Sequence, residues 1–247
     1  MDDASGLIGV SDLELPVLPD EALTDPLAGR VDPRAWFADP ARPLEIEIGS
    51  GKGTFLLEQA RRTPEVNFLG IEWAREFYLY AADRVRRAGL KNVRMLRADA
   101  TEFLRWRCPD GIVSVIHLYF SDPWPKKKHH KNRVVQDRFL AEAWRVLKGE
   151  RQSGGAGGHD GESLRRGELR VVTDHEELWE WDLEHFRRWT TMDVPAPGWK
   201  SFGRPPFELA PFTPPAWVGE GQLVGTNYER KMCVGREPFA GVLRKSG

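Results

Sequence analysis

Residues 44–53 read Leu44-Glu45-Ile46-Glu47-Ile48-Gly49-Ser50-Gly51-Lys52-Gly53, and this short segment carries the clearest signal of architecture. Its first half alternates apolar and acidic residues, which is the period of a β-strand, and a helical pattern follows from Thr54 to Arg62. The three alternating glycines between them allow a sharp turn and a close approach of the backbone to a ligand. The segment therefore predicts a first strand-turn-helix unit.

The same alternation continues toward the C-terminus. Strands are predicted at 66–71, 92–96, 112–120, 168–173 and 227–234, with helices at 74–88, 101–107, 134–147 and 175–189. Strands that alternate with helices form a parallel, doubly wound α/β sheet, and such sheets bind ligands beyond the carboxyl ends of their strands.

Three segments fall outside this alternation. Residues 1–43 are rich in proline and aspartate without a period, so we expect an irregular N-terminal arm before a single domain at 44–247. Residues 150–167 include a glycine-rich run and predict a flexible loop. Residues 195–215 carry several prolines among aromatic residues, which predicts an irregular wall or lid.

Positive charge is local in this chain. The 36 lysines and arginines are offset by 37 acidic residues, yet residues 126–133 contain no acid. A purely solvated charge run is the plain alternative, but the run follows a buried-type strand, which favours contacts to the phosphates of a nucleic acid. The basic residues of the run are Lys126, Lys127, Lys128, Lys131 and Arg133.

Two cysteines, Cys108 and Cys233, are too few for a disulfide framework and lack the spacing of metal ligands. No apolar stretch is long enough to span a membrane, and the first residues lack the pattern of a secretory signal. The sequence thus favours a cytoplasmic protein without a metal ion.

Four carboxylates fall at or just before the ends of predicted strands: Glu47, Glu72, Asp99 and Asp122. They are 25, 27 and 23 residues apart, about one strand-helix unit each, so we expect them along one edge of the sheet. Singly, each could be a helix-start acid or a helix cap.

Together these acids predict a ligand. Glu47 could pair with an ammonium group, Glu72 could accept from both ribose hydroxyls, and Asp99 could accept from an adenine amino group. The glycine spacing fits neither the dinucleotide fingerprint nor the phosphate-binding loop. An adenosine that bears an amino acid, S-adenosyl-L-methionine, meets these requirements.

With these residues the sequence resembles the tRNA (guanine-N7)-methyltransferases of the TrmB type over roughly residues 44–235. The Asp-Pro-Trp-Pro-Lys-Lys run and the terminal Thr-x-Tyr-Glu are specific to that family, whereas many class I methyltransferases share the glycine-rich turn. The motifs that carry the resemblance are Glu47 to Gly53, Gly70-Ile71-Glu72, Asp99-Ala100, Ser121 to His130, Val172-Thr173-Asp174 and Thr226 to Glu229.

The resemblance implies a Rossmann-like, mostly parallel sheet of seven strands and methyl transfer to the variable-loop guanine, position 46 of tRNA. It places Asp122 at the catalytic centre. The implied cofactor-binding residues are Glu47, Gly49, Gly51, Gly53, Glu72, Asp99, Ala100 and Asp122. The implied substrate-binding residues are Lys126, Asp174, Thr226, Asn227, Tyr228 and Glu229. Ser121 and a longer insertion after Lys148 depart from the family pattern and concern loop geometry.

Several questions stay open at this point. An inactive RNA-binding subunit and a class I methyltransferase with another substrate are the competing functions, disfavoured respectively by the row of acids and by the basic run. Trp124 fits base stacking and structural packing equally well. Monomer and homodimer are both compatible with the sequence.

Overall fold

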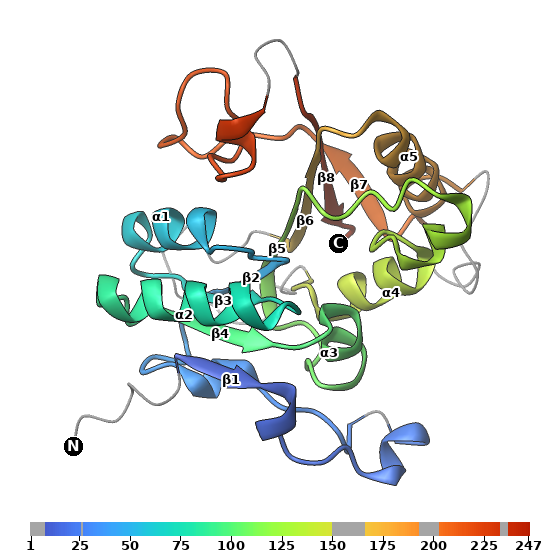
Figure 1. Cartoon of the computed structure of the whole chain (residues 1–247). Helices are drawn as coiled ribbons and strands as arrows, with labels where there is room; N and C mark the ends of the chain where they lie inside the picture. The colour runs from blue at the N-terminus through green and yellow to red at the C-terminus, as the bar shows by residue number, and fades with distance from the viewer. Residues whose placement is uncertain (1–7, 26, 150–165, 193–202, 233–236) are drawn as a thin grey trace, which may run out of the picture.

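A computed structural model describes residues 8–25, 27–149, 166–192, 203–232 and 237–247 (Figure 1). The strands are β1 (Gly9–Ser11), β2 (Leu44–Ile48), β3 (Asn67–Ile71), β4 (Val93–Arg97), β5 (Val113–Tyr119), β6 (Glu168–Thr173), β7 (Phe207–Ala210) and β8 (Phe239–Lys245). The α-helices are α1 (Thr54–Arg62), α2 (Arg75–Ala88), α3 (Ala100–Trp106), α4 (Asp137–Val146) and α5 (Glu176–Thr190).

The strands form one sheet in the order β1-β4-β3-β2-β5-β6-β8-β7. The pairs from β1 through β6 are parallel, and β8 runs antiparallel to both β6 and β7. The order reverses between β2 and β5, where the chain crosses from one half of the sheet to the other. This confirms the doubly wound, mostly parallel sheet.

Helices cover both faces of the sheet, as the side-chain alternation of the strands requires. On one face, Leu56 of α1 and Val85 of α2 pack with Phe68 of β3. The other face carries α3, α4 and α5, whose apolar side chains join the largest core cluster together with Ile46 and Leu118. Burying one leucine, valine, isoleucine or phenylalanine side chain stabilises the fold by roughly 1.5–3 kcal/mol.

The sheet has eight strands in the described part of the chain, one more than predicted. The additional strand is β1, so the arm is not wholly irregular. Its Gly9 pairs with Met95 of β4, and the Ile8 carbonyl accepts a hydrogen bond from the Met95 N–H at 2.6 Å. Three-residue edge strands leave no periodic signal in a sequence.

The prediction of a last strand at 227–234 is wrong. A 3-10 helix occupies Glu229–Lys231, and the final strands are β7 and β8, which pair with each other. Residues 150–165 of the predicted loop and 195–202 of the predicted wall lie outside the described residues, as does the predicted strand beyond residue 232. Across the described ranges, no helix combines the length and apolarity that a bilayer crossing requires.

Candidate active site

The glycine-rich turn after β2 adopts a backbone that side chains disfavour. Gly49, Gly51 and Gly53 have φ values of 70°, 51° and 66°, in the left-handed region. A Cβ built on Gly49 or Gly51 meets no atom within 4 Å, whereas one on Gly53 lies 3.1 Å from the Ala81 Cβ of α2. The first two glycines therefore border open space at the sheet edge, and the third serves helix packing.

Glu47 lies on the strand that leads into this turn. Its side chain is buried, with the residue 4% exposed, and within the described residues its Oε2 atom has no hydrogen-bond partner. Burial raises the pKa of Glu47 to about 8; a hydrogen bond from Ser50 opposes the increase and the charge of Glu72 adds to it. A buried carboxyl with an open oxygen is costly unless a cation pairs with it.

Glu72, at the end of β3, joins the turn to its own strand. Its Oε2 accepts from the Gly51 N–H at 2.7 Å, and its Oε1 accepts from the Ala74 N–H at 2.8 Å. An ionised carboxylate has about four lone-pair sites, so each oxygen can accept a further bond from a hydroxyl. The two backbone N–H groups thus fix the orientation of the Glu72 carboxylate, and its contact to a ribose diol stays a prediction.

Asp99 and Ala100 follow β4. Asp99 caps helix α3, because its Oδ1 accepts from the Glu102 N–H at 3.0 Å. The residue is exposed, while Ala100 begins the helix. Capping was the plain alternative for Asp99, and its contact to a cofactor stays a prediction.

The segment after β5 has an unusual backbone on both sides of Asp122. Phe120 and Trp124 have φ values of 53° and 43°, although neither is glycine. Residues held in this region cost of order 1–3 kcal/mol each and persist where the surroundings fix them. Phe120 is fixed by its N–H, which donates to the Val172 carbonyl at 2.7 Å, and by its ring, whose centroid is 5.0 Å from that of Tyr228. Asp122 itself is exposed.

The basic run forms the 3-10 helix η5 (Lys127–Asn132) directly after this segment. Trp124 turns back onto it, edge-on to His129 with 5.8 Å between ring centroids. This contact favours a packing role for the tryptophan in the described structure. The lysines that were predicted to contact phosphate are all exposed: Lys126, Lys127, Lys128 and Lys131.

Arg133 contradicts the prediction of a phosphate contact. Its side chain is only 1% exposed and lies over the Trp181 ring at 5.2 Å. Nε donates to the Pro123 carbonyl at 2.9 Å, and Nη2 pairs with Glu177 Oε1 at 2.9 Å. Arg133 therefore ties the Asp122 segment to helix α5. Nearby, burial raises the pKa of Asp182 to about 8, although the Arg133 charge opposes the increase.

Two of the predicted substrate residues meet just beyond the end of β6. The Tyr228 hydroxyl donates to Asp174 Oδ2 at 3.3 Å, which brings two distant segments of the chain together. Thr226 Oγ1 accepts from the Glu229 N–H at 3.1 Å, and the neighbouring Asn227 is half-buried.

Glu229, which the resemblance implied to be a substrate-binding residue, is directed into its own loop. It is buried, and its carboxylate accepts from the backbone N–H groups of Leu223, Val224 and Gly225, at 3.0 Å and 2.6 Å for the last two. Its lone pairs thus fold the loop that carries Thr226. Asp174 is the acid of this group that stands nearer solvent.

Sequence reasoning missed the structural roles of Phe120, Arg133 and Glu229. Phe120 is an aromatic residue at a strand end, which marks a packing position but not a left-handed backbone. Arg133 differs from the lysines before it only in being followed by two valines, and this apolar neighbourhood was the available sign of burial. In the described part of the chain, no group of three or more His, Cys, Asp or Glu side chains could hold a metal ion.

Comparison with known proteins places the chain among methyltransferases. The model of a family described as "Putative methyltransferase" matches residues 41–153. A tRNA (guanine-N(7)-)-methyltransferase from Streptococcus pneumoniae (strain 70585) is 31% identical over 171 residues, 69% of this chain and 72% of that protein. One from Geobacillus kaustophilus (strain HTA426) is 36% identical over 165 residues, 67% and 68% of the two chains. The chain belongs to the tRNA (guanine-N(7)-)-methyltransferase family.

The fold agrees with that membership. A solved 30S ribosomal A1408 methyltransferase from an uncultured bacterium superposes with a TM-score of 0.50 at 12% identity, covering 94% of this chain and 96% of the other. As a member of the tRNA (guanine-N(7)-)-methyltransferase family, the present chain uses S-adenosyl-L-methionine as its cofactor.

The residues at the sheet edge fit that cofactor. The open Oε2 of Glu47 suits the ammonium of its amino-acid part, and the free space at Gly49 and Gly51 admits the cofactor close to the backbone. Glu72 can accept from the ribose hydroxyls. Among the described residues no cation pairs with the buried Glu47, and this is the feature of the edge that best fits the ammonium group of the cofactor.

Proposed function

We propose that this protein transfers the methyl group of S-adenosyl-L-methionine to N7 of the variable-loop guanine, position 46, of tRNA. The observation that carries the proposal is the position of Asp122. It is exposed and follows β5, between the buried acids of the cofactor edge and the exposed lysines of η5. A methyl donor and a polyanion can meet there.

In this reaction the main task of the protein is to position the guanine against the methyl donor. Guanine N7 has an in-plane lone pair and needs no base to remove a proton before it attacks the methyl group, which the bound cofactor supplies. Positioning two reactants can contribute several kcal/mol, about 7–11 at best. The tie from Arg133 to Pro123 and the fixed backbone at Phe120 hold Asp122 ready for this purpose.

Methylation at N7 leaves a positive charge on the purine. The Asp122 carboxylate can stabilise that developing charge, an effect that is larger in the transition state than in the ground state. We therefore assign Asp122 to electrostatic stabilisation and orientation of the base.

Guanine recognition falls to Asp174 in this proposal. Guanine presents N1–H and an exocyclic amine, and a carboxylate accepts from both, whereas adenine has an acceptor at N1. The Tyr228 hydroxyl orients Asp174 by its hydrogen bond. Glu229 supports the loop from behind, since its oxygens are bound to the backbone.

The enzyme would act in the cytoplasm on tRNA, with Lys126, Lys127, Lys128 and Lys131 contacting phosphates. The test uses methyl-labelled S-adenosyl-L-methionine and an unmodified tRNA transcript, followed by borohydride reduction and aniline cleavage at N7-methylguanosine. Cleavage at position 46 is expected. A transcript with adenine at position 46 is the matched control and should remain uncut. Label incorporation that persists in this control would assign the activity to another base.

A further inference from the structure

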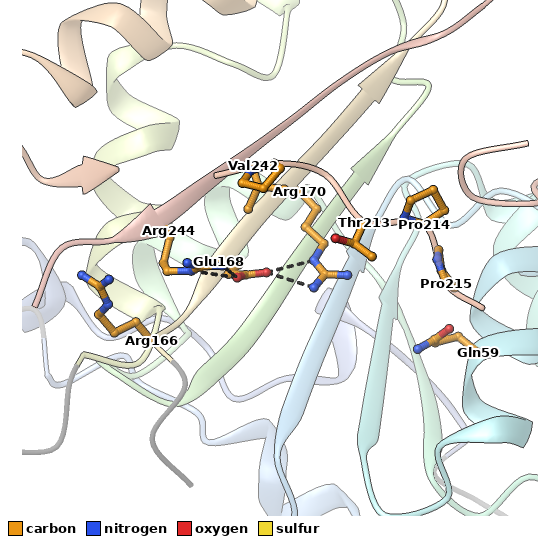
Figure 2. A pocket seen from close by; sticks show the side chains of 10 residues that line it. Gln59, Arg166, Glu168, Arg170, Thr213, Pro214, Pro215, Val242 and Arg244 are labelled. Carbon is orange, nitrogen blue, oxygen red and sulfur yellow. Dashed lines mark hydrogen bonds and ion pairs between the residues drawn. The ribbon is translucent and has the colours of Figure 1, made fainter. Parts of the chain in front are cut away.

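A second concave site lies on the sheet face that α1 flanks, away from the cofactor edge. Figure 2 shows its side chains, which border a cavity of about 590 Å³. Glu168 and Arg170 lie at the beginning of β6, whereas the cofactor acids lie at or just after the opposite ends of the parallel strands. The cavity is lined by Gln59, Arg166, Glu168, Arg170, Pro211, Thr213, Pro214, Pro215, Val242 and Arg244.

Two guanidinium groups in this cavity share one carboxylate. Arg170 donates to Glu168 Oε2 from Nε at 3.1 Å and from Nη2 at 2.9 Å. Arg244 donates to Oε1 of the same residue at 3.0 Å and 2.7 Å. Burial works to raise the pKa of Glu168, but these arginines outweigh it and lower the pKa, so Glu168 is ionised.

The remaining polar groups at the wall are mostly donors. Gln59 Oε1 accepts from Trp217 Nε1 at 2.6 Å, so the amide NH₂ group is what Gln59 can offer to a ligand. Among the described residues, neither Nη1 of Arg170 nor Nη1 of Arg244 donates to another protein atom, and Thr213 adds a hydroxyl. Figure 2 shows the Arg170 guanidinium between Glu168 and the wall formed by Pro214, Pro215 and Gln59.

Other acids near this face are already engaged. Glu208 binds Arg166 through two hydrogen bonds, at 2.9 Å and 3.0 Å, and so neutralises the third arginine. Glu45 pairs with His117 at 2.8 Å and does not line the cavity. A cavity with spare donors and a saturated acid selects a ligand that accepts hydrogen bonds, that is, an anion.

We infer that this cavity binds the phosphate of a nucleotide unit, with Arg170 and Arg244 on the phosphate and the proline wall against its sugar or base. Arginine forks match phosphate oxygens, and a volume of this size holds a group larger than a bare ion. The nucleotide can be free or part of the tRNA backbone; the second source rests on the proposed function.

The experiment titrates GMP and inorganic phosphate into the protein saturated with S-adenosylhomocysteine, by calorimetry, so that the cofactor cleft is blocked. One GMP site is expected, with weaker binding of phosphate alone. Arg244→Gln should weaken GMP binding about tenfold, since a charge-assisted pair is lost. Arg86→Gln, an exposed arginine of α2 that pairs with Asp83, is the matched control and should bind as the unchanged protein does. Thermal unfolding checks that both variants fold.

Direct binding of unmodified tRNA separates the two sources, and it needs no methylation. If Arg244→Gln weakens tRNA binding and Arg86→Gln does not, the occupant is the tRNA backbone. If only GMP binding weakens, the occupant is a free nucleotide. If Arg244→Gln changes none of the affinities for GMP, phosphate or tRNA, the inference is overturned. If the unchanged protein binds GMP but does not methylate tRNA, the result counts against the proposed function alone.

Discussion

Glu47 and Glu72 are buried at the ends of β2 and β3, whereas Lys126, Lys127 and Lys128 are exposed beyond β5. Glu47 is held as part of β2 and Glu72 by two backbone N–H groups, so removing either acid changes a site of fixed geometry. The lysines lie at the start of the 3-10 helix η5 and act through charge, which salt screens. A single substitution on the cofactor side should therefore disrupt cofactor binding. On the RNA side, each lysine removed should weaken tRNA binding by one small step.

Asp122 stands between the two regions and should show the largest effect. Asp122→Ala removes the charge that stabilises the methylated purine, and we expect kcat to fall by about 100- to 1000-fold, the range for loss of one preorganised electrostatic group. Single-turnover methylation of tRNA measures it. Asp122→Asn keeps the shape and should be similarly slow. Near-normal rates for both variants would remove Asp122 from the mechanism.

Glu47→Gln probes the cofactor side alone. The amide cannot pair with an ammonium as a charge, so the affinity for S-adenosylhomocysteine should fall by about 10- to 100-fold. Calorimetry measures this affinity. tRNA binding should stay unchanged, and a variant with weakened tRNA binding but normal cofactor affinity would contradict the division of the two regions.

The pH dependence sharpens the same point. Because the pKa of Glu47 is about 8 in the free protein, its carboxyl is mostly protonated near pH 6–7. The carboxyl must lose this proton to form an ion pair with the ammonium group of the ligand. Binding should release a proton and strengthen as pH rises toward 8. In the free protein the raised pKa makes folding take up a proton, so this group lowers the free energy of unfolding as pH rises from about 5 to 8. Glu47→Gln should lose both dependences.

Arg133→Lys tests whether a buried cation on the RNA side behaves like the cofactor side. Lysine keeps the charge but cannot reach both Pro123 and Glu177 with a planar fork, so kcat should fall about tenfold through misplacement of Asp122. KM for tRNA and its salt dependence should hold steady. A raised KM with an unchanged kcat would instead indicate that Arg133 contacts a tRNA phosphate.

The smallest effect is expected from neutralising Lys126, Lys127 and Lys128 together. At low salt KM for tRNA should rise several-fold, and the slope of log affinity against log salt should drop by about two to three. Arg86, Arg87 and Lys91, exposed on and after α2, form a control with the same charge change. Equal losses of tRNA affinity in both triple variants would show that the three lysines contribute only nonspecific attraction.

The sequence predicted the first four strand-helix units well because each has a local cause. Alternation marked β2, glycines marked the turn at Gly49 to Gly53, and apolar periods marked the helices. The strand-end acids could be ordered for the same reason, since one unit has a nearly constant length. The burial of Glu47 and Glu72 and the open Oε2 of Glu47 could not be predicted, because burial depends on what α1 and α2 place over the sheet.

Features that depend on distant pairing were not predictable. β7 and β8 pair with each other across the long intervening segment 211–238, and β7 is only four residues long, too short to show a strand period. Glu229 matched a motif, yet its oxygens face the backbone of the same loop. Arg133 sat in a run of lysines, and its burial depends on the Pro123 carbonyl and on Glu177 and Trp181 of a distant helix, α5.

The short strand β1 has a consequence for the behaviour of the protein in concentrated solution. By pairing with Met95 to Arg97 it covers the outer backbone of β4, which would otherwise offer unpaired N–H and C=O groups to a strand of another molecule. Tyr78 closes over it so tightly that a Cβ on Gly9 would meet the phenol oxygen at 2.5 Å. Residues that take no part in methyl transfer thus protect the enzyme from edge-to-edge aggregation.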